Sequence, residues 1–165
     1  MKINGNLFVP SKIAYVRGDK PAVECILCAI IIKDPRVKSL EVFRSAHFSL
    51  CANLYPYSPG HLLIFPKRHV EDVRELTLAE SRELFHLEKR TLDILDKLYH
   101  PHGYNIGYNI GEWSGNSIKH LHLHIVPRYR NELGFVDIIT ETRIIVDDPV
   151  KNLPRLRKLF KAKTF

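Results

Sequence analysis

A stretch of alternating histidine and aliphatic residues at positions 120–125 constrains the fold of this chain more than any other feature. A period of two is the side-chain period of a β-strand, in which successive side chains point to opposite faces. We therefore predict a strand over His120–Val126. Its leucine and isoleucine side chains face a core, and its three histidines lie together on the other face.

Three imidazoles on one face of a strand do not suit an apolar core, because a buried polar ring must be satisfied within a site. Same-face neighbours on a strand lie about 7 Å apart, so His120, His122 and His124 splay too far to share one small metal ion. A neutral imidazole, with a reference pKa of about 6.5, can instead attack phosphorus and form a phosphoramidate. The alternation therefore favours a nucleophilic histidine site.

The remaining patterns predict an α+β fold, in which an antiparallel sheet carries one long packed helix. Thr77 and Glu80 form a capping box, and the apolar residues that follow at helical spacing predict a helix to about Tyr99. The prolines and the glycine between Tyr55 and Gly60 predict a turn. Further strands are predicted at Val42–Phe43, His47–Leu54, His61–Phe65 and Tyr104–Ile110, and residues 25–32 are a short helix or strand.

Length and composition are those of one globular domain, with 165 residues of which 45% are hydrophobic and 26% charged. We predict an N-terminal arm over residues 1–24, a domain over residues 25–150 and a basic tail over residues 151–165. The formal net charge is +7, and six of these charges are lysines and arginines of the tail, which leaves +1 on residues 1–150. We interpret the tail as a terminal helix with a solvated polar face, and an arm that binds a polyanion is the alternative.

The apolar segments and the cysteines indicate the compartment. No secretory signal is evident, and the longest apolar run, Cys25–Ile32, is too short to cross a membrane, so we expect a cytoplasmic protein. Cys25 and Cys28 form a C-x-x-C pair, which in a reducing compartment indicates metal or redox chemistry. Cys51 lies within an apolar run and is predicted to be a small core residue.

Several segments together resemble the histidine triad superfamily. The H-x-H-x-H pattern, followed by two apolar residues, matches the signature of that family. Residues 58–69 resemble its P-G-H-apolar-P-K-x-H segment, and Asn109–Gly111 and Gly115–Ser117 also match. The similarity covers roughly residues 25–130 in the family's order.

The resemblance implies a role for each matching residue. His122 would form the nucleotidyl–enzyme intermediate, His124 would face the same phosphate, and His120 would support the surroundings of the nucleophile. The positions implied to hold phosphate are Asn109, Asn116 and Ser117. The positions implied to bind the nucleoside are Asn53, at the ribose hydroxyls, and His61, Leu63 and Leu50 around it. No carboxylate cluster for magnesium is evident, which is consistent with a route that uses no catalytic metal.

The resemblance further implies a structural zinc ion, as in some branches of the family. Its ligands would be Cys25, Cys28, His69 and His120, because two thiolates and two imidazoles satisfy tetrahedral zinc. Two buried thiols in an apolar segment are the alternative. Family members commonly form homodimers through the long helix and the strand ahead of the triad, so a homodimer is also implied.

The residues after the triad indicate a branch of the family. Arg128 after Pro127 resembles the fragile histidine triad hydrolases and the short diadenosine tetraphosphate phosphorylases, and residues 134–145 loosely resemble the latter. We therefore expect an adenine nucleotide substrate, a dinucleoside polyphosphate that is cleaved by hydrolysis or phosphorolysis. The alternatives are hydrolysis of adenosine phosphoramidate, removal of adenylate from DNA ends, and nucleotide binding without catalysis. The nearly neutral body disfavours a nucleic-acid partner.

Overall fold

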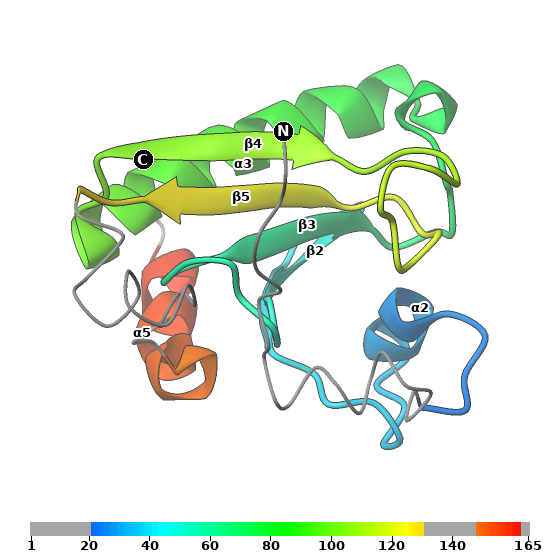
Figure 1. The fold of residues 1–165 in the computed structure, drawn as a ribbon, viewed down its shortest axis with the longest axis horizontal. Helices are drawn as coiled ribbons and strands as arrows, with labels where there is room; N and C mark the ends of the chain where they lie inside the picture. The colour runs from blue at the N-terminus through cyan, green and yellow to red at the C-terminus, as the bar shows by residue number, and fades with distance from the viewer. Residues whose placement is uncertain (1–20, 131–147, 163–165) are drawn as a thin grey trace, which may run out of the picture.

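The computed structural model describes residues 21–130 and 148–162. Its elements are α2 (Ile26–Ile31), β1 (Glu41–Arg44), β2 (Phe48–Ala52), β3 (Leu62–Pro66), the 3-10 helix η1 (Val73–Glu75), α3 (Leu78–Tyr99), β4 (Gly103–Tyr108), β5 (Leu123–Arg128) and α5 (Pro149–Lys161). The five strands form one antiparallel sheet in the order β1-β2-β3-β5-β4, and α3 lies along one face of it (Figure 1). This architecture confirms the predicted α+β class. Within the described ranges, no helix is both long enough and apolar enough to cross a bilayer.

Helix α3 begins at the predicted capping box. The Thr77 hydroxyl accepts a hydrogen bond from the Glu80 amide at 3.3 Å, and the Glu80 carboxylate accepts one from the Thr77 amide at 2.8 Å. The helix ends at Tyr99, and the next residue, His100, has a left-handed φ of 48°. These local signals explain why the bounds of α3 were readable from the sequence.

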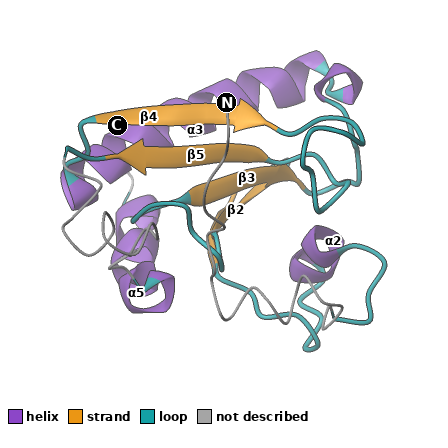
Figure 2. Cartoon of the chain, viewed as in Figure 1, coloured by secondary structure: helices purple, strands orange, loops and turns teal. Residues whose placement is uncertain are grey.

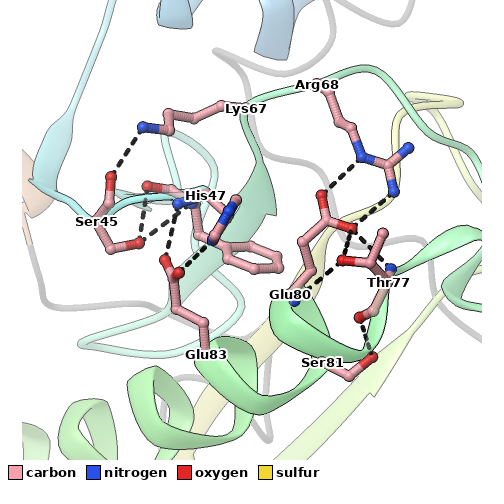
Figure 3. Close-up of polar contacts among 9 residues, drawn as sticks. Ser45, His47, Lys67, Arg68, Thr77, Glu80, Ser81 and Glu83 are labelled. Carbon is pink, nitrogen blue, oxygen red and sulfur yellow. Dashed lines mark hydrogen bonds and ion pairs between the residues drawn. The ribbon is translucent and has the colours of Figure 1, made fainter.

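A second set of polar contacts ties the start of α3 to the end of β3 (Figure 3). Arg68 donates from Nε to Glu80 Oε1 at 2.7 Å and from Nη2 to Glu80 Oε2 at 2.8 Å. His47, just ahead of β2, pairs with Glu83 one turn further along the helix. The helix is therefore anchored to the sheet through side chains as well as through the core.

Alternation along the central strands separates two apolar layers. On β2, Phe48, Leu50 and Ala52 belong to the main core under α3, whereas Cys51 belongs to a second cluster with Leu63 and residues of α2. Every residue of β2 and β3 is buried, because both faces of these strands are covered. Alternate residues along each strand therefore point into different layers, and the position of a residue along the strand decides which layer its side chain enters.

Residues 149–161 form the helix α5, and its apolar face packs into the main core. Leu153, Leu156 and Phe160 are 7%, 1% and 1% exposed, and Arg157 Nε donates to the Glu41 carbonyl at 2.9 Å. The segment that the sequence analysis set apart as a basic tail is thus packed onto the domain as far as residue 162. Helices α5 and α2 lie far from each other, at opposite sides of the view in Figure 2.

Strand β5 begins at Leu123, so the predicted strand over His120–Val126 was wrong at its start. The backbone ahead of Leu123 leaves the sheet, because the Leu121 amide donates to the Val70 carbonyl at 2.7 Å in a loop. The other predicted strands lie within one or two residues of the observed ones, and residues 25–32 contain a helix. The segment 134–145 and most of the N-terminal arm lie outside the described residues.

Candidate active site and metal centre

A cavity of about 310 Å³ lies between α2, the strands β2 and β3, and the segment ahead of β5. Its size is at the lower end of the range for small-molecule sites. The residues that the sequence analysis placed in a nucleotide site and that line this cavity are Asn53, Leu63, Ser117, His122 and His124. Three apolar side chains of α2 also line the cavity, and they are Ile26, Leu27 and Ile30. The cavity therefore joins an apolar chamber to a polar edge.

His122 presents one defined nitrogen to this cavity. Its Nδ1 lies 2.7 Å from the His120 carbonyl oxygen, and because a carbonyl only accepts, Nδ1 carries the proton. The lone pair is therefore on Nε2. Burial lowers the pKa of His122, and the residue is only 6% exposed, so the neutral, nucleophilic form is the stable one at neutral pH.

His124 and His61 form a chain of oriented imidazoles beside His122. The Tyr57 amide donates to His61 Nδ1 at 3.1 Å, which leaves the His61 proton on Nε2. That proton points to His124 Nδ1 at 3.0 Å, so a neutral His124 carries its own proton on Nε2. The rings of His122 and His124 lie 4.7 Å apart, edge to face. An imidazole with its lone pair on Nε2 and an imidazole with its proton on Nε2 are thus neighbours in one cavity.

The turn between β2 and β3 holds the polar edge in place. Asn53 Oδ1 accepts a hydrogen bond from the Tyr55 backbone amide at 3.0 Å, and the backbone amide of Asn53 donates to the His61 carbonyl at 3.0 Å. Gly60 has a φ of 79°, and a Cβ there would meet the Tyr99 ring at 3.1 Å. A larger residue at position 60 would therefore be strained and crowded.

The phosphate-binding positions of the sequence analysis differ in their surroundings. Ser117 lines the cavity, whereas Asn116 Oδ1 accepts from the Ile118 amide at 3.1 Å and thereby shapes the loop. Asn109 directly follows β4 and does not line the cavity. Only Ser117 of this group therefore has its surface in the cavity.

Leu50 also lies elsewhere than the resemblance implied. It is 0% exposed in the main core, because its position on β2 turns its side chain toward α3. Its neighbour Cys51 lines the cavity instead, as strand alternation allows.

The sequence patterns also missed Tyr57, which lines the cavity and stacks on His124 with ring centres 5.9 Å apart. No spacing rule identifies an aromatic residue inside an irregular turn.

His120 lies outside the cavity, in a cluster with Cys25, Cys28 and His69. The ligand atoms of these four residues all lie within 4.8 Å of one another. Cys28 Sγ is 3.3 Å from His69 Nδ1 and 3.4 Å from His120 Nδ1, and Cys25 Sγ is also 3.4 Å from His120 Nδ1. Tetrahedral zinc with ordinary bond lengths places sulfur and nitrogen ligands about 3.5 Å apart. The cluster has the dimensions of such a site.

The protonation of this cluster also fits a metal. His120 Nε2 donates to the Pro66 carbonyl at 2.9 Å, which leaves the Nδ1 lone pair directed at the thiols. Burial lowers the pKa of His120 to about 4, so the imidazole remains neutral. Burial and the neighbouring Cys25 raise the pKa of Cys28 to about 11, and a bound cation is what would favour its thiolate. The four residues therefore fit zinc.

Comparison with known proteins gives the family that the sequence motifs resemble. The HIT domain family model matches residues 34–131. The AP-4-A phosphorylase of Mycobacterium tuberculosis is 40% identical over 94 residues, which are 56% of this chain and 48% of that protein. The bis(5'-nucleosyl)-tetraphosphatase (asymmetrical) of Schizosaccharomyces pombe is 30% identical over 103 residues, which are 62% of this chain and 57% of that protein. The chain thus spans about half the length of these relatives.

A solved structure extends the similarity to the fold. A Zn-bound histidine triad family protein from Mycobacterium smegmatis superposes with a TM-score of 0.67 at 25% identity, covering 82% of this chain and 92% of that one. The family match includes the triad, the preceding loop and the strands β1–β5. The chain belongs to the histidine triad (HIT) family.

Proposed function

We propose that this protein cleaves dinucleoside polyphosphates, such as diadenosine tetraphosphate, through a covalent nucleotidyl intermediate on His122. The observation that carries the proposal is the orientation of His122, whose Nδ1–H bond to a backbone carbonyl leaves the Nε2 lone pair for attack. Two relatives bear the names of enzymes that act on such nucleotides, a phosphorylase and a tetraphosphatase. A phosphorylase and a hydrolase can share the first step, formation of the nucleotidyl intermediate, and differ in whether phosphate or water then attacks it.

In the first step, His122 Nε2 attacks the α-phosphorus of a nucleotide whose nucleoside occupies the cavity. A P–N bond forms, the bond between phosphorus and the bridging oxygen breaks, and the departing nucleotide keeps that electron pair. His124, with its proton on Nε2, is the neighbouring group that can give a proton to the departing oxygen. Ser117 lines the cavity beside both histidines and is suited to hold a phosphate oxygen.

In the second step, water or inorganic phosphate attacks the phosphorus of the intermediate. The P–N bond breaks, its electron pair returns to His122 Nε2, and the acceptor loses a proton to His124. Water as the acceptor gives a nucleoside monophosphate, and phosphate gives a nucleoside diphosphate. The protein mainly positions the reacting groups and neutralises charge, because the departing nucleotide is already a good leaving group.

We also propose that Cys25, Cys28, His69 and His120 hold a structural zinc ion. Zinc there would link α2, which forms one wall of the cavity, to the segment that carries His122.

We further propose a homodimer joined along β4, since β4 is an edge strand and Asn105, Ile106 and Gly107 on it are exposed.

Product analysis with diadenosine tetraphosphate, with and without inorganic phosphate, tests the proposed function. ATP plus AMP in both conditions identifies a hydrolase, and ATP plus ADP only with phosphate identifies a phosphorylase. We expect His122→Asn to lower kcat by at least about 10³-fold. His86→Asn, the same change at an exposed position on α3, leaves kcat unchanged.

Two results would overturn parts of this proposal. Cleavage of adenosine phosphoramidate without any cleavage of the tetraphosphate would replace the dinucleotide substrate by a phosphoramidate. Substantial turnover by folded His122→Asn would remove His122 from the chemistry.

A further inference from the structure

Trp113 is the single tryptophan of the chain, and it is 96% exposed. The next most exposed large apolar side chain among the described residues is Ile32, at 74%. An indole in water lacks the stabilisation that it gains when another surface covers it. Single exposed apolar residues are common, so exposure alone does not indicate a binding role for Trp113. Its position relative to the cavity has to indicate the ligand.

Trp113 lies on the loop that leads into the cavity. It is placed between Gly111 and Gly115, whose φ values of 88° and 78° are left-handed. Ser114 closes the turn, because its hydroxyl donates to the Gly111 carbonyl at 2.8 Å. Ser117, four residues after Trp113, lines the cavity, and four residues of chain span at most about 14 Å. The indole is therefore presented to solvent on the same loop as Ser117, within reach of the cavity that Ser117 lines.

The size of the cavity matters for a substrate that carries two nucleosides. Its volume of about 310 Å³ suits one nucleoside, with the α-phosphate at His122. The remaining phosphates and the second nucleoside must then lie outside, beyond the catalytic histidines. Ser117, on the same loop as Trp113, lines this cavity together with His122, so the loop that carries the indole reaches the catalytic end of the cavity.

We propose that Trp113 stacks on the base of the second nucleoside, the one that remains outside the cavity. This inference rests on the proposed function and adds a residue that selects dinucleotides over mononucleotides. Stacking uses the flat face that every base has, so Trp113 would favour a second nucleoside without selecting its base. The full exposure of the indole leaves this face available in the free protein.

Steady-state kinetics with two substrates test the proposal. We expect Trp113→Ala to lower kcat/KM for diadenosine tetraphosphate about tenfold, chiefly through KM, and Trp113→Phe to have a smaller effect. Adenosine phosphoramidate has no second nucleoside, so its kcat/KM stays unchanged in both variants. Phe85→Ala, which removes an aromatic side chain that is 59% exposed on α3, leaves both substrates unaffected.

Fluorescence of the single tryptophan gives a second readout with the wild-type protein. A methylene-bridged analogue of diadenosine tetraphosphate, which resists cleavage, should quench the emission of Trp113 by stacking. Saturating AMP fills only the cavity and should leave the emission nearly unchanged. Equal quenching by AMP, or binding of the analogue without any spectral change, would overturn the proposal.

The outcomes separate this proposal from the proposed function. If the wild type cleaves the tetraphosphate and Trp113→Ala does so equally well, the stacking proposal fails and the proposed function stands. If the wild type does not cleave the tetraphosphate, both fail. If Trp113→Ala weakens both substrates and lowers the mass measured by light scattering, Trp113 belongs to an interface between two copies of the chain, and the stacking proposal fails.

Discussion

At the scale of single residues, backbone groups decide which nitrogen carries the proton in three of the histidines. Carbonyl oxygens accept from His122 Nδ1 and His120 Nε2, and a backbone amide donates to His61 Nδ1. Backbone groups do not titrate, so the same carbonyl or amide selects the tautomer whenever the ring is neutral. One imidazole thereby directs its lone pair into the cavity, and another directs its lone pair toward the thiols.

Glu80 contributes a pH-dependent part of the stability. Two hydrogen bonds from Arg68, with those from Thr77, lower the pKa of this carboxyl from 4.5 to about 2, and the residue is 4% exposed. A lowered pKa means that the stabilisation is complete above pH 4.5 and is lost as the pH falls toward 2. We expect Glu80→Gln to lower the urea midpoint at pH 7 and to reduce the loss of stability between pH 7 and pH 3.

The control for this prediction is Glu112→Gln, which changes an exposed carboxyl and should keep the wild-type midpoints at both pH values. Equal acid sensitivity of Glu80→Gln and the wild type would show that other carboxyls are responsible.

At the scale of elements, the short helix α2 lines the cavity and also carries the two cysteines of the Cys/His cluster at its start. Its side chains Leu27 and Ile30 are buried and line the cavity, and Cys25 caps its first turn, where Sγ accepts from the Cys28 amide. A six-residue helix has little stability of its own. A metal at Cys25 and Cys28 would therefore fix a cavity wall that local propensity leaves weak.

The zinc proposal leads to a measurable dependence of stability on metal. Protein purified without chelator should contain about one equivalent of zinc per chain, and removing the metal should lower the melting temperature. Cys28→Ala should lose the zinc, whereas Cys51→Ala, which removes a thiol outside the cluster, should retain it. Folded wild-type protein that holds no zinc after growth with added metal would contradict the proposal.

At the scale of the whole molecule, α5 completes the main core. Phe160 stacks on Phe43 with ring centres 5.5 Å apart, and the guanidinium of Arg90 lies 5.0 Å from the Phe43 ring and 5.4 Å from the Phe160 ring. Arg90 also donates to the Phe160 carbonyl, near the end of α5. The last helix is thus joined to β1 and α3, outside the segment that matches the family model.

We expect Phe160→Ala to lower the free energy of unfolding by about 3–5 kcal/mol, because it removes a large side chain that is 1% exposed. Urea unfolding measures this change. Lys158→Ala, at an exposed position on the same helix, should shift it by less than about 0.5 kcal/mol. A similarly small effect for Phe160→Ala would mean that α5 does not stabilise the domain.

The fold class and α3 were predictable because their signals are local. The capping box at Thr77 and Glu80 and the helical spacing after it depend only on neighbours in the chain. The alternation at 120–125 correctly placed Leu123 and Ile125 in the core, but it extended the strand too far. His120 leaves the sheet because its partners come from other segments, the Pro66 carbonyl and the cluster with Cys25, Cys28 and His69.

By itself the sequence determined which residue types are available for the proposed nucleophile and the proposed metal site, and in which order they occur. Tertiary structure alone decided their neighbours: Cys51 rather than Leu50 faces the cavity, Tyr57 stacks on His124, and α5 packs into the core. The physical reason is that periodicity tells which side chains share a face of an element. Which other element covers that face depends on contacts between residues far apart in the chain.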